Sequence, residues 1–308
     1  MRGEPTAAYV AIAAMLASTL FYLLGDTVVK IAAETLPVPQ IIAIRGALAA
    51  LLVATAAFFL GVLKHWRRML TPRVLSRGGL DAATTLLFTS ALAHMRIADA
   101  TAIINAVPIA ATVFAIFMLH EKVSALRWSA IIAGFVGVLM ILRPDPEGFN
   151  YYGLLAVAAM IVVAMRDVVT RRIAADIPSL IVTLCSTLTV SAAGFLASLI
   201  TWKWIPMAQA EFLNLCLAAV LLFGAYHFSV VSLRFGEVSL VGPFRYAILL
   251  WALIVGYLVW GDVPDWLVIS GMMLITLAGL VVFRAEIRRP SIAGSASSPD
   301  SPPDIKRV

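Results

Sequence analysis

The stretch GDTVVK at residues 25–30 recurs, with its charges in the same places, as RDVVTRR at residues 166–172. In both stretches a basic residue follows an Asp by four positions, and Pro37 or Pro178 follows the same Asp by eleven. The chain around them is 62% hydrophobic and only 13% charged. A charge pattern that is repeated in so apolar a chain indicates two related halves.

The composition indicates a membrane protein. Soluble domains carry about 25% charged residues, whereas this chain of 308 residues has a mean hydropathy of +0.97. A helix needs about 20 apolar residues to cross a bilayer. Runs with few or no charges occupy 5–25, 46–63, 82–95, 100–119, 128–142, 148–165, 177–202, 212–233, 246–261 and 266–283. The sequence therefore predicts an all-α polytopic membrane protein with ten transmembrane helices.

Further matches extend the repeat along the chain. ALAHMRIADAT at 91–101 aligns with SVVSLRFGEVS at 229–239, and GFVGVLMI at 134–141 resembles TLAGLVVF at 276–283. Each half holds five spans, and an odd number of spans places the second half upside down relative to the first. Inverted repeats are common in secondary transporters, whose substrate site lies between the halves near mid-membrane.

The repeat divides the chain into three parts. The first repeat is expected over 1–145 and the second over 146–286, and a Ser- and Pro-rich tail at 287–308 is expected to be disordered.

The basic residues predict the orientation. With the N-terminus inside, ten spans leave sixteen Lys or Arg in the inner loops and tails and four on the outer side. Cytoplasmic loops carry an excess of such residues. Both termini of a multi-pass inner-membrane protein are therefore expected in the cytoplasm, and the net charge of +6 needs no nucleic-acid partner.

Three segments carry a family resemblance. They are LPVPQIIAIRGALAALL at 36–52, the stretch 91–144 ending in GFVGVLMILRP, and SLVGPFRYAILLWALIVGYLVWGDVPD at 239–265. The chain resembles the drug/metabolite transporter superfamily in its ten-span EamA group. The resemblance implies a central cavity lined mainly by spans 1–4 and 6–9, with spans 5 and 10 outside it. It also implies transport of small organic metabolites, often amino acids, with some members taking up compounds such as S-adenosylmethionine or riboflavin.

Two arginines fall inside predicted spans. Arg45 lies about 10 Å into span 2 and Arg245 a similar distance into span 9, at about 1.5 Å per residue. An Arg at this depth usually faces a cavity or a partner. Either residue could bind a substrate carboxylate through forked hydrogen bonds, or be held by backbone carbonyls at a helix break such as that expected at Pro243.

Aromatic and polar residues complete the candidate substrate site. These are Phe244, Tyr246 and Trp251 around Arg245, Tyr226 and His227 in span 8, and Asn105 in span 4. The rings could stack on a planar substrate or be ordinary packing residues. His227 could carry a proton or be hydrogen-bonded in the packing. Pro108, after Asn105, is expected to interrupt span 4 as Pro243 interrupts span 9.

The repeated charges of the opening stretches suggest gates. Asp26 with Lys30 should lie near the outer surface, and Asp167 with Arg171 near the inner one, each pair on one helix face. The alternative is that both are ordinary pairs at helix ends.

Other functions find no support in the motifs. The four His lack the spacing of a metal site such as HExxH, and no GxxxxGK[ST] loop is present for a nucleotide. Cys185 and Cys216 stand inside apolar runs as small core residues. We expect no enzyme activity, no cofactor and no metal.

The sequence thus predicts a secondary transporter that works by alternating access. The leading substrates are amino acids or related zwitterions, which the protein would export. The alternative is uptake of a planar nucleoside- or flavin-like metabolite, and a third reading is a non-transporting assembly subunit. The expected partners are the small-molecule substrate and the lipid bilayer, and the sequence is compatible with a monomer or a homodimer.

Overall fold

The computed structural model describes residues 5–119, 125–142, 151–174, 176–235 and 238–287, and every regular element in these ranges is a helix. The first half contains α1 (Pro5–Ala32), α2 (Val38–Phe59), the 3₁₀ helix η1 (Leu63–Leu70), α3 (Pro72–His94), α4 (Ile97–Ile104), α5 (Val107–Leu119) and α6 (Ala125–Leu142). The second contains α7 (Tyr151–Arg171), α8 (Ser179–Thr201), α9 (Gln209–Phe235), α10 (Val238–Val241), the 3₁₀ helix η2 (Gly242–Tyr246), α11 (Ala247–Trp260) and α12 (Trp266–Ile287). The predicted all-α class is confirmed.

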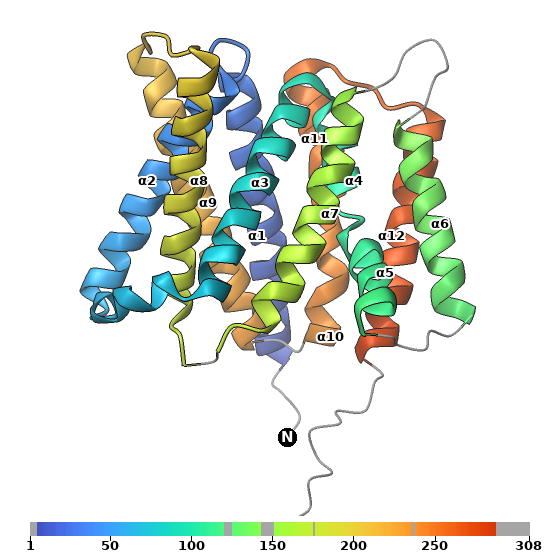
Figure 1. Cartoon of the computed structure of the whole chain (residues 1–308). Helices are drawn as coiled ribbons and strands as arrows, with labels where there is room; N and C mark the ends of the chain where they lie inside the picture. The colour runs from blue at the N-terminus through green and yellow to red at the C-terminus, as the bar shows by residue number, and fades with distance from the viewer. Residues whose placement is uncertain (1–4, 120–124, 143–150, 175, 236–237, 288–308) are drawn as a thin grey trace, which may run out of the picture.

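The helices run up and down through one bundle (Figure 1). Among the described residues, eight helical segments are long and apolar enough to cross a membrane, and the apolar helix Trp128–Leu142 is shorter. Helix α3 has 23 residues but carries Arg73, Arg77 and Asp81. The structure is that of a polytopic membrane protein, while the count of ten spans stays a prediction. The tail from residue 288 lies outside the described residues.

The repeated prolines produce the same local structure twice. Pro37 precedes α2 and Pro178 precedes α8, each with φ −60° and ψ 134°. Proline fixes φ near this value, and its missing N–H costs nothing at a helix start, where that group has no partner within the helix. The repeat seen in the sequence therefore begins equivalent helices.

Both expected helix interruptions are present. Helix α4 stops at Ile104, where the Asn105 side chain donates to the Thr101 carbonyl at 2.8 Å, and Pro108 lies in the first turn of α5. In the second half the 3₁₀ turn η2, which contains Pro243, separates α10 from α11. Proline removes one backbone hydrogen bond and clashes with the preceding turn, which accounts for both breaks.

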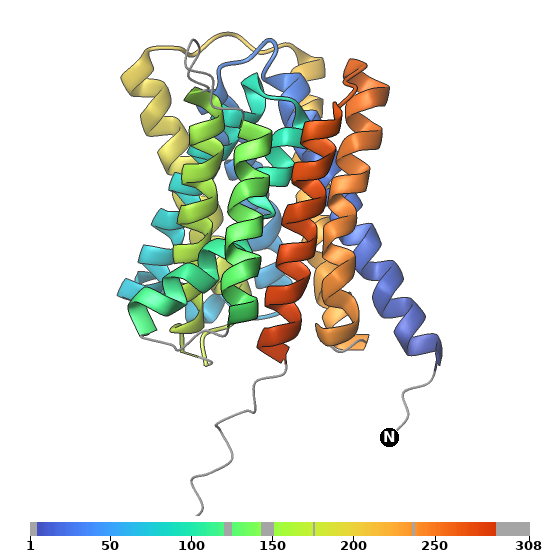
Figure 2. The ribbon, with the colours of Figure 1, turned by 90° about the vertical axis from the view of Figure 1, so that its right-hand side faces the viewer.

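Helices from the two halves pack in pairs. Helix α1 lies along α9, α2 along α8, α3 along α7 and α6 along α12. Buried Ser18 and Ser232 each donate to a backbone carbonyl across the α1–α9 contact, at 2.8 and 2.7 Å. Figures 1 and 2 both show α6 and α12 side by side at one edge of the bundle.

Small residues allow two of these crossings to be close. A side chain at Gly194 of α8 would meet the backbone of Ala43 in α2, and one at Gly137 of α6 would meet the carbonyl of Gly271 in α12. Helices in membranes associate largely through such close packing, because lipid tails are as apolar as the side chains they would replace.

The bundle has two faces that matter for function. The first, called here the η1 face, holds η1, the start of α1 and the end of α12, at the bottom of Figure 1. The opposite face holds the loops at 33–37, 202–208 and 261–265. The first and last helices therefore begin and end on the same side of the protein.

Candidate substrate site

An ion pair joins α1 and α2 inside the bundle. Nη2 of Arg45 lies 4.0 Å from Oδ1 of Asp26, and the side chains are only 15% and 23% exposed. Asp26 lies six residues before the end of α1 and Arg45 seven after the start of α2, so both are about 9–11 Å from the opposite face. Nε of Arg45 is buried and has no hydrogen-bond partner among the described residues.

Two tyrosines adjoin this pair. Tyr22 is one turn before Asp26 on α1, and its ring meets that of Tyr226 in α9 edge to face, with centroids 5.7 Å apart. Both tyrosines interact electrostatically with Arg45. The structure thus brings Tyr226 and Arg45 together as candidate binding residues and adds Tyr22, which our sequence analysis missed. Its signal was its position four residues before Asp26, on the same face of α1.

Lys30 and Asp26 have different partners, although they share a helix face. Nζ of Lys30 donates to the carbonyls of Leu92 and Met95 at 3.0 and 2.7 Å and lies 5.3 Å from the ring centroid of Trp260. Lys30 therefore ties α1 to the end of α3 at the opposite face. The gating role predicted for Asp26 and Lys30 stays a prediction.

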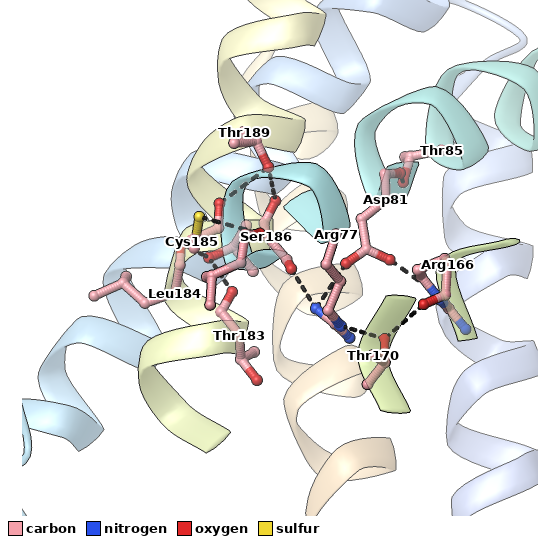
Figure 3. Close-up of polar contacts among 12 residues, drawn as sticks. Arg77, Asp81, Thr85, Arg166, Thr170, Thr183, Leu184, Cys185, Ser186 and Thr189 are labelled. Atoms are coloured by element: carbon pink, nitrogen blue, oxygen red, sulfur yellow. Dashed lines mark hydrogen bonds and ion pairs between the residues drawn. The ribbon is translucent and has the colours of Figure 1, made fainter. Parts of the chain in front are cut away.

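A second charged cluster joins α3, α7 and α8 (Figure 3). Asp81 accepts from Arg77 at 2.9 Å and from Arg166 at 3.1 Å, and Arg166 also contacts Asp167 at 2.7 Å. Arg77 further donates to the hydroxyls of Thr170, at 3.0 Å, and Ser186. We call Arg77, Asp81, Arg166 and Asp167 the inner cluster. Counted along α3 and α7, it lies about 6–14 Å from the η1 face.

Sequence reasoning found only part of the inner cluster. Asp167 was predicted to pair with Arg171, but it contacts its neighbour Arg166, and the side chain of Arg171 lies outside the described side chains. Asp81 was missed. Asp81 could have been recognised from the sequence because it follows Arg77 by four residues, a spacing that places the two on one helix face.

The residues predicted around Arg245 do not converge on it. Phe244 packs with Ala11 and Met15 of α1, and the hydroxyl of Tyr246 lies against Gly279 of α12. Arg245 itself is exposed.

The remaining candidates also lie apart. Nε1 of Trp251 donates to Thr19 of α1 at 3.3 Å. The exposed ring of His227 lies edge to face with Phe228, at 5.7 Å between centroids. Asn105 caps α4.

The tyrosine pair lies within electrostatic range of both charged groups. Arg166 of the inner cluster lies within Coulomb range of both tyrosines, and Arg245 lies within that range of Tyr22. Two aromatic rings with hydroxyls, the part-buried Tyr22 and the exposed Tyr226, thus lie near charges that belong to α2, α7 and η2. Such a site can bind a small polar molecule through charge-assisted hydrogen bonds and ring contacts.

The chain matches a known family of membrane transporters. The EamA-like transporter family matches the chain twice, over residues 9–143 and 151–284. The chain belongs to this family. The repeated match covers nearly all of the described helices, and it confirms the resemblance on which the sequence analysis relied.

Relatives of this EamA protein are named as transporters of different substrates. The pseudopaline exporter CntI of Pseudomonas aeruginosa is 26% identical over 89% of this chain and 95% of its own length. An S-adenosylmethionine uptake transporter of Rickettsia prowazekii is 24% identical over 65% of this chain and 67% of its own. A riboflavin transporter of Rhizobium johnstonii is 29% identical over 73% and 72%.

A solved crystal structure shares the fold. It is 20% identical and covers 94% of this chain and 100% of its own, with a TM-score of 0.61. The family and its relatives identify the chain as a multi-pass membrane transporter of small molecules and point away from an enzyme.

Proposed function

We propose that this EamA protein is a secondary transporter that exports amino acids or related zwitterions, with Arg45 and Asp26 holding the two charges of the substrate. The proposal rests on the long distance between Arg45 and Asp26, which ion-pair without a hydrogen bond. Charge-assisted N–H···O bonds are about 2.7–2.9 Å long, whereas Arg45 and Asp26 are 4.0 Å apart. The guanidinium of Arg45, whose Nε has no partner among the described residues, can therefore donate hydrogen bonds to a second carboxylate.

The two charges of an α-amino acid complement those of these two side chains. Its carboxylate and its ammonium group sit on one carbon, so one molecule can face Arg45 with the first and Asp26 with the second. Each charge then meets an opposite charge inside the bundle, where an unpaired charge is costly. Tyr22 and Tyr226 would contact the substrate side chain.

The packing of the helices supports alternating access between two inverted repeats, 1–145 and 146–286. If each helix of one half is matched with its counterpart in the other, the α1–α9 contact corresponds to the α3–α7 contact. The α2–α8 contact joins two counterparts, as does the α6–α12 contact, so exchanging the halves leaves both contacts unchanged. The inner cluster lies at a depth below the η1 face similar to that of the Asp26–Arg45 pair below the opposite face, so it can close the η1 side while that pair holds the substrate.

The second candidate function is uptake of a planar nucleoside- or flavin-like metabolite. The observation that favours it is the tyrosine pair together with relatives named for S-adenosylmethionine and riboflavin. Export is placed first because the relative that aligns over 89% of this chain is named an exporter.

A flux comparison in proteoliposomes tests the substrate class. Vesicles containing the purified protein are loaded with a panel of amino acids, their carboxamides, riboflavin and S-adenosylmethionine. We expect efflux of at least one amino acid and at least tenfold slower efflux of its carboxamide, because the carboxamide has no charge for Arg45. Equal flux of acid and amide would contradict the proposed role of Arg45, and flux of the planar compounds alone would favour the second function.

The orientation can be tested independently. The η1 face carries exposed Lys64, Arg67, Arg73 and Arg172, which supports a cytoplasmic position in the bacterial inner membrane for this face and for both termini. Reporter fusions at Arg68 and after the last helix should read as cytoplasmic, and a fusion at Trp204 as periplasmic. A periplasmic signal at Arg68 would reverse the orientation.

A further inference from the structure

Two adjoining pockets lie beneath the η1 face, away from the Arg45–Asp26 pair. Cavities of about 350 and 460 Å³ share a wall made of Ile173, Ala174 and Ile177 in the segment between α7 and α8. The smaller is also lined by Arg77, Thr170, Ser179, Val182 and Thr183, and the larger by Thr71, Pro72 and Arg73. Each pocket thus combines an apolar wall with one arginine and at least one hydroxyl.

The surroundings of the pockets carry excess positive charge. Residues 63–81 and 172–183 contain the six basic residues Lys64, Arg67, Arg68, Arg73, Arg77 and Arg172 and the two acidic residues Asp81 and Asp176, an excess of 6 − 2 = 4 charges. Both acids are already paired, Asp81 with Arg77 and Arg166, and Asp176 with Arg68. The hydrogen bond from Arg68 also lowers the pKa of Asp176.

Arg73 is the basic residue best placed at the mouth. Its side chain is exposed, and its Nη1 donates to the backbone carbonyl of Arg172 at 3.0 Å. This contact holds the guanidinium over the segment that forms the shared wall. Its other donors are available to a ligand, since a guanidinium has five N–H groups.

The adjoining helix has the composition of a membrane-interface element. Trp66 and Leu70 of η1 are 51% and 62% exposed, and Arg67 lies 5.8 Å from the ring of Trp66. Tryptophan is enriched at the level of lipid headgroups, and helices with apolar and basic faces lie in that plane. A ligand that enters the pockets from this side would come from the membrane surface.

We propose that the two pockets bind an anionic phospholipid from the leaflet at the η1 face. The phosphate would contact Arg73 and the nearby hydroxyls, and the glycerol and upper acyl carbons would lie against Ile173, Ala174 and Ile177. Charge complementarity selects this occupant, because a zwitterionic lipid gains little from an excess of basic residues, whereas an anionic surface attracts each of them.

Native mass spectrometry of the full-length protein, released from detergent with phosphatidylglycerol or phosphatidylcholine, tests this site. We expect phosphatidylglycerol to bind at least tenfold more tightly than phosphatidylcholine. Arg73→Gln should weaken it about fivefold, as expected for loss of one basic residue near an anionic surface. The matched control is Lys203→Gln on the opposite face, which should leave binding unchanged.

A second variant separates a pocket from a charged surface. Ala174→Trp places a large ring on the shared wall, where it fills pocket space without changing any charge. It should therefore weaken phosphatidylglycerol binding as much as Arg73→Gln. Equal binding of the two lipids would overturn the proposal, as would equal effects of Arg73→Gln and Lys203→Gln or unchanged binding by Ala174→Trp. Competition by millimolar inorganic phosphate would assign the pocket to a free anion and also overturn it.

Discussion

Arg45→Ala is expected to lower the rate of substrate efflux by about two orders of magnitude. Removing one partner of a buried ion pair costs about 3–5 kcal/mol, and each 1.4 kcal/mol is a factor of ten in affinity. In the variant both the substrate carboxylate and Asp26 would lose their cation inside the bundle. The measurement is the initial efflux rate in proteoliposomes, normalised to the amount of inserted protein.

Two further variants show whether the loss is specific. Arg45→Lys keeps the charge but loses the forked donor geometry, so it should retain an intermediate rate. Lys203→Ala removes a cation from the exposed loop at 202–208 and should transport normally. An Arg45→Ala protein that keeps more than half of the parent rate would remove Arg45 from the substrate site.

Asp81→Ala is expected both to destabilise the protein and to open the η1 face. Asp81 is the only link between Arg77 and Arg166 among the ion pairs of the described residues, and its side chain is 14% exposed. Its loss leaves two partly buried guanidinium groups without that carboxylate, which should lower the melting temperature by several degrees. Replacing both Asp81 and Arg77 by Leu should recover part of this loss, because Arg166 keeps its contact with Asp167 and no guanidinium of the cluster is left without a carboxylate.

The native cysteines report the opening. Cys185 is buried in α8 beside Ser186, which contacts Arg77, whereas Cys216 lies in α9 away from the cluster. A charged thiol reagent applied from the η1 side should label Cys185 about tenfold faster in Asp81→Ala than in the parent, with Cys216 unchanged. A lower melting temperature with unchanged Cys185 labelling would make the inner cluster a structural contact and not a gate.

The sequence predicted the local structure well, because local structure depends on neighbours in the chain. Pro37 and Pro178 begin equivalent helices, and Pro108 and Pro243 lie at the two helix breaks. Each hydrophobic run overlaps a helix of the structure, although the run at 100–119 is divided between α4 and α5.

The charged contacts were harder to predict, because their partners lie on other helices. The spacing of Asp26 and Lys30 places them on one helix face, but it does not reveal that Arg45 of α2 is nearer to Asp26 or that Lys30 reaches backbone carbonyls of α3. Asp81 and Arg166 are 85 residues apart in the chain and meet only after α3 packs on α7.

The aromatic residues beside Arg245 point to different helices, and their role in substrate binding stays a prediction. Phe244, Arg245 and Tyr246 are adjacent in sequence, yet successive residues of a helical turn point in different directions. The structure accordingly directs Phe244 to α1 and Tyr246 to α12. Tyr22, Tyr226 and Arg45 come from three helices, yet they lie nearer to one another than the residues beside Arg245 do.

Binding of paired substrate analogues decides whether Arg45 and Asp26 each hold one charge of a zwitterion. Affinities are measured for the transported amino acid, its carboxamide and its N-acetyl derivative, with the parent, Arg45→Ala and Asp26→Asn. We predict that Arg45→Ala abolishes the preference for the acid over the carboxamide and that Asp26→Asn abolishes the preference for the free amine over the acetylated one. If both variants keep both preferences, the charges of the substrate are held elsewhere and the account is contradicted.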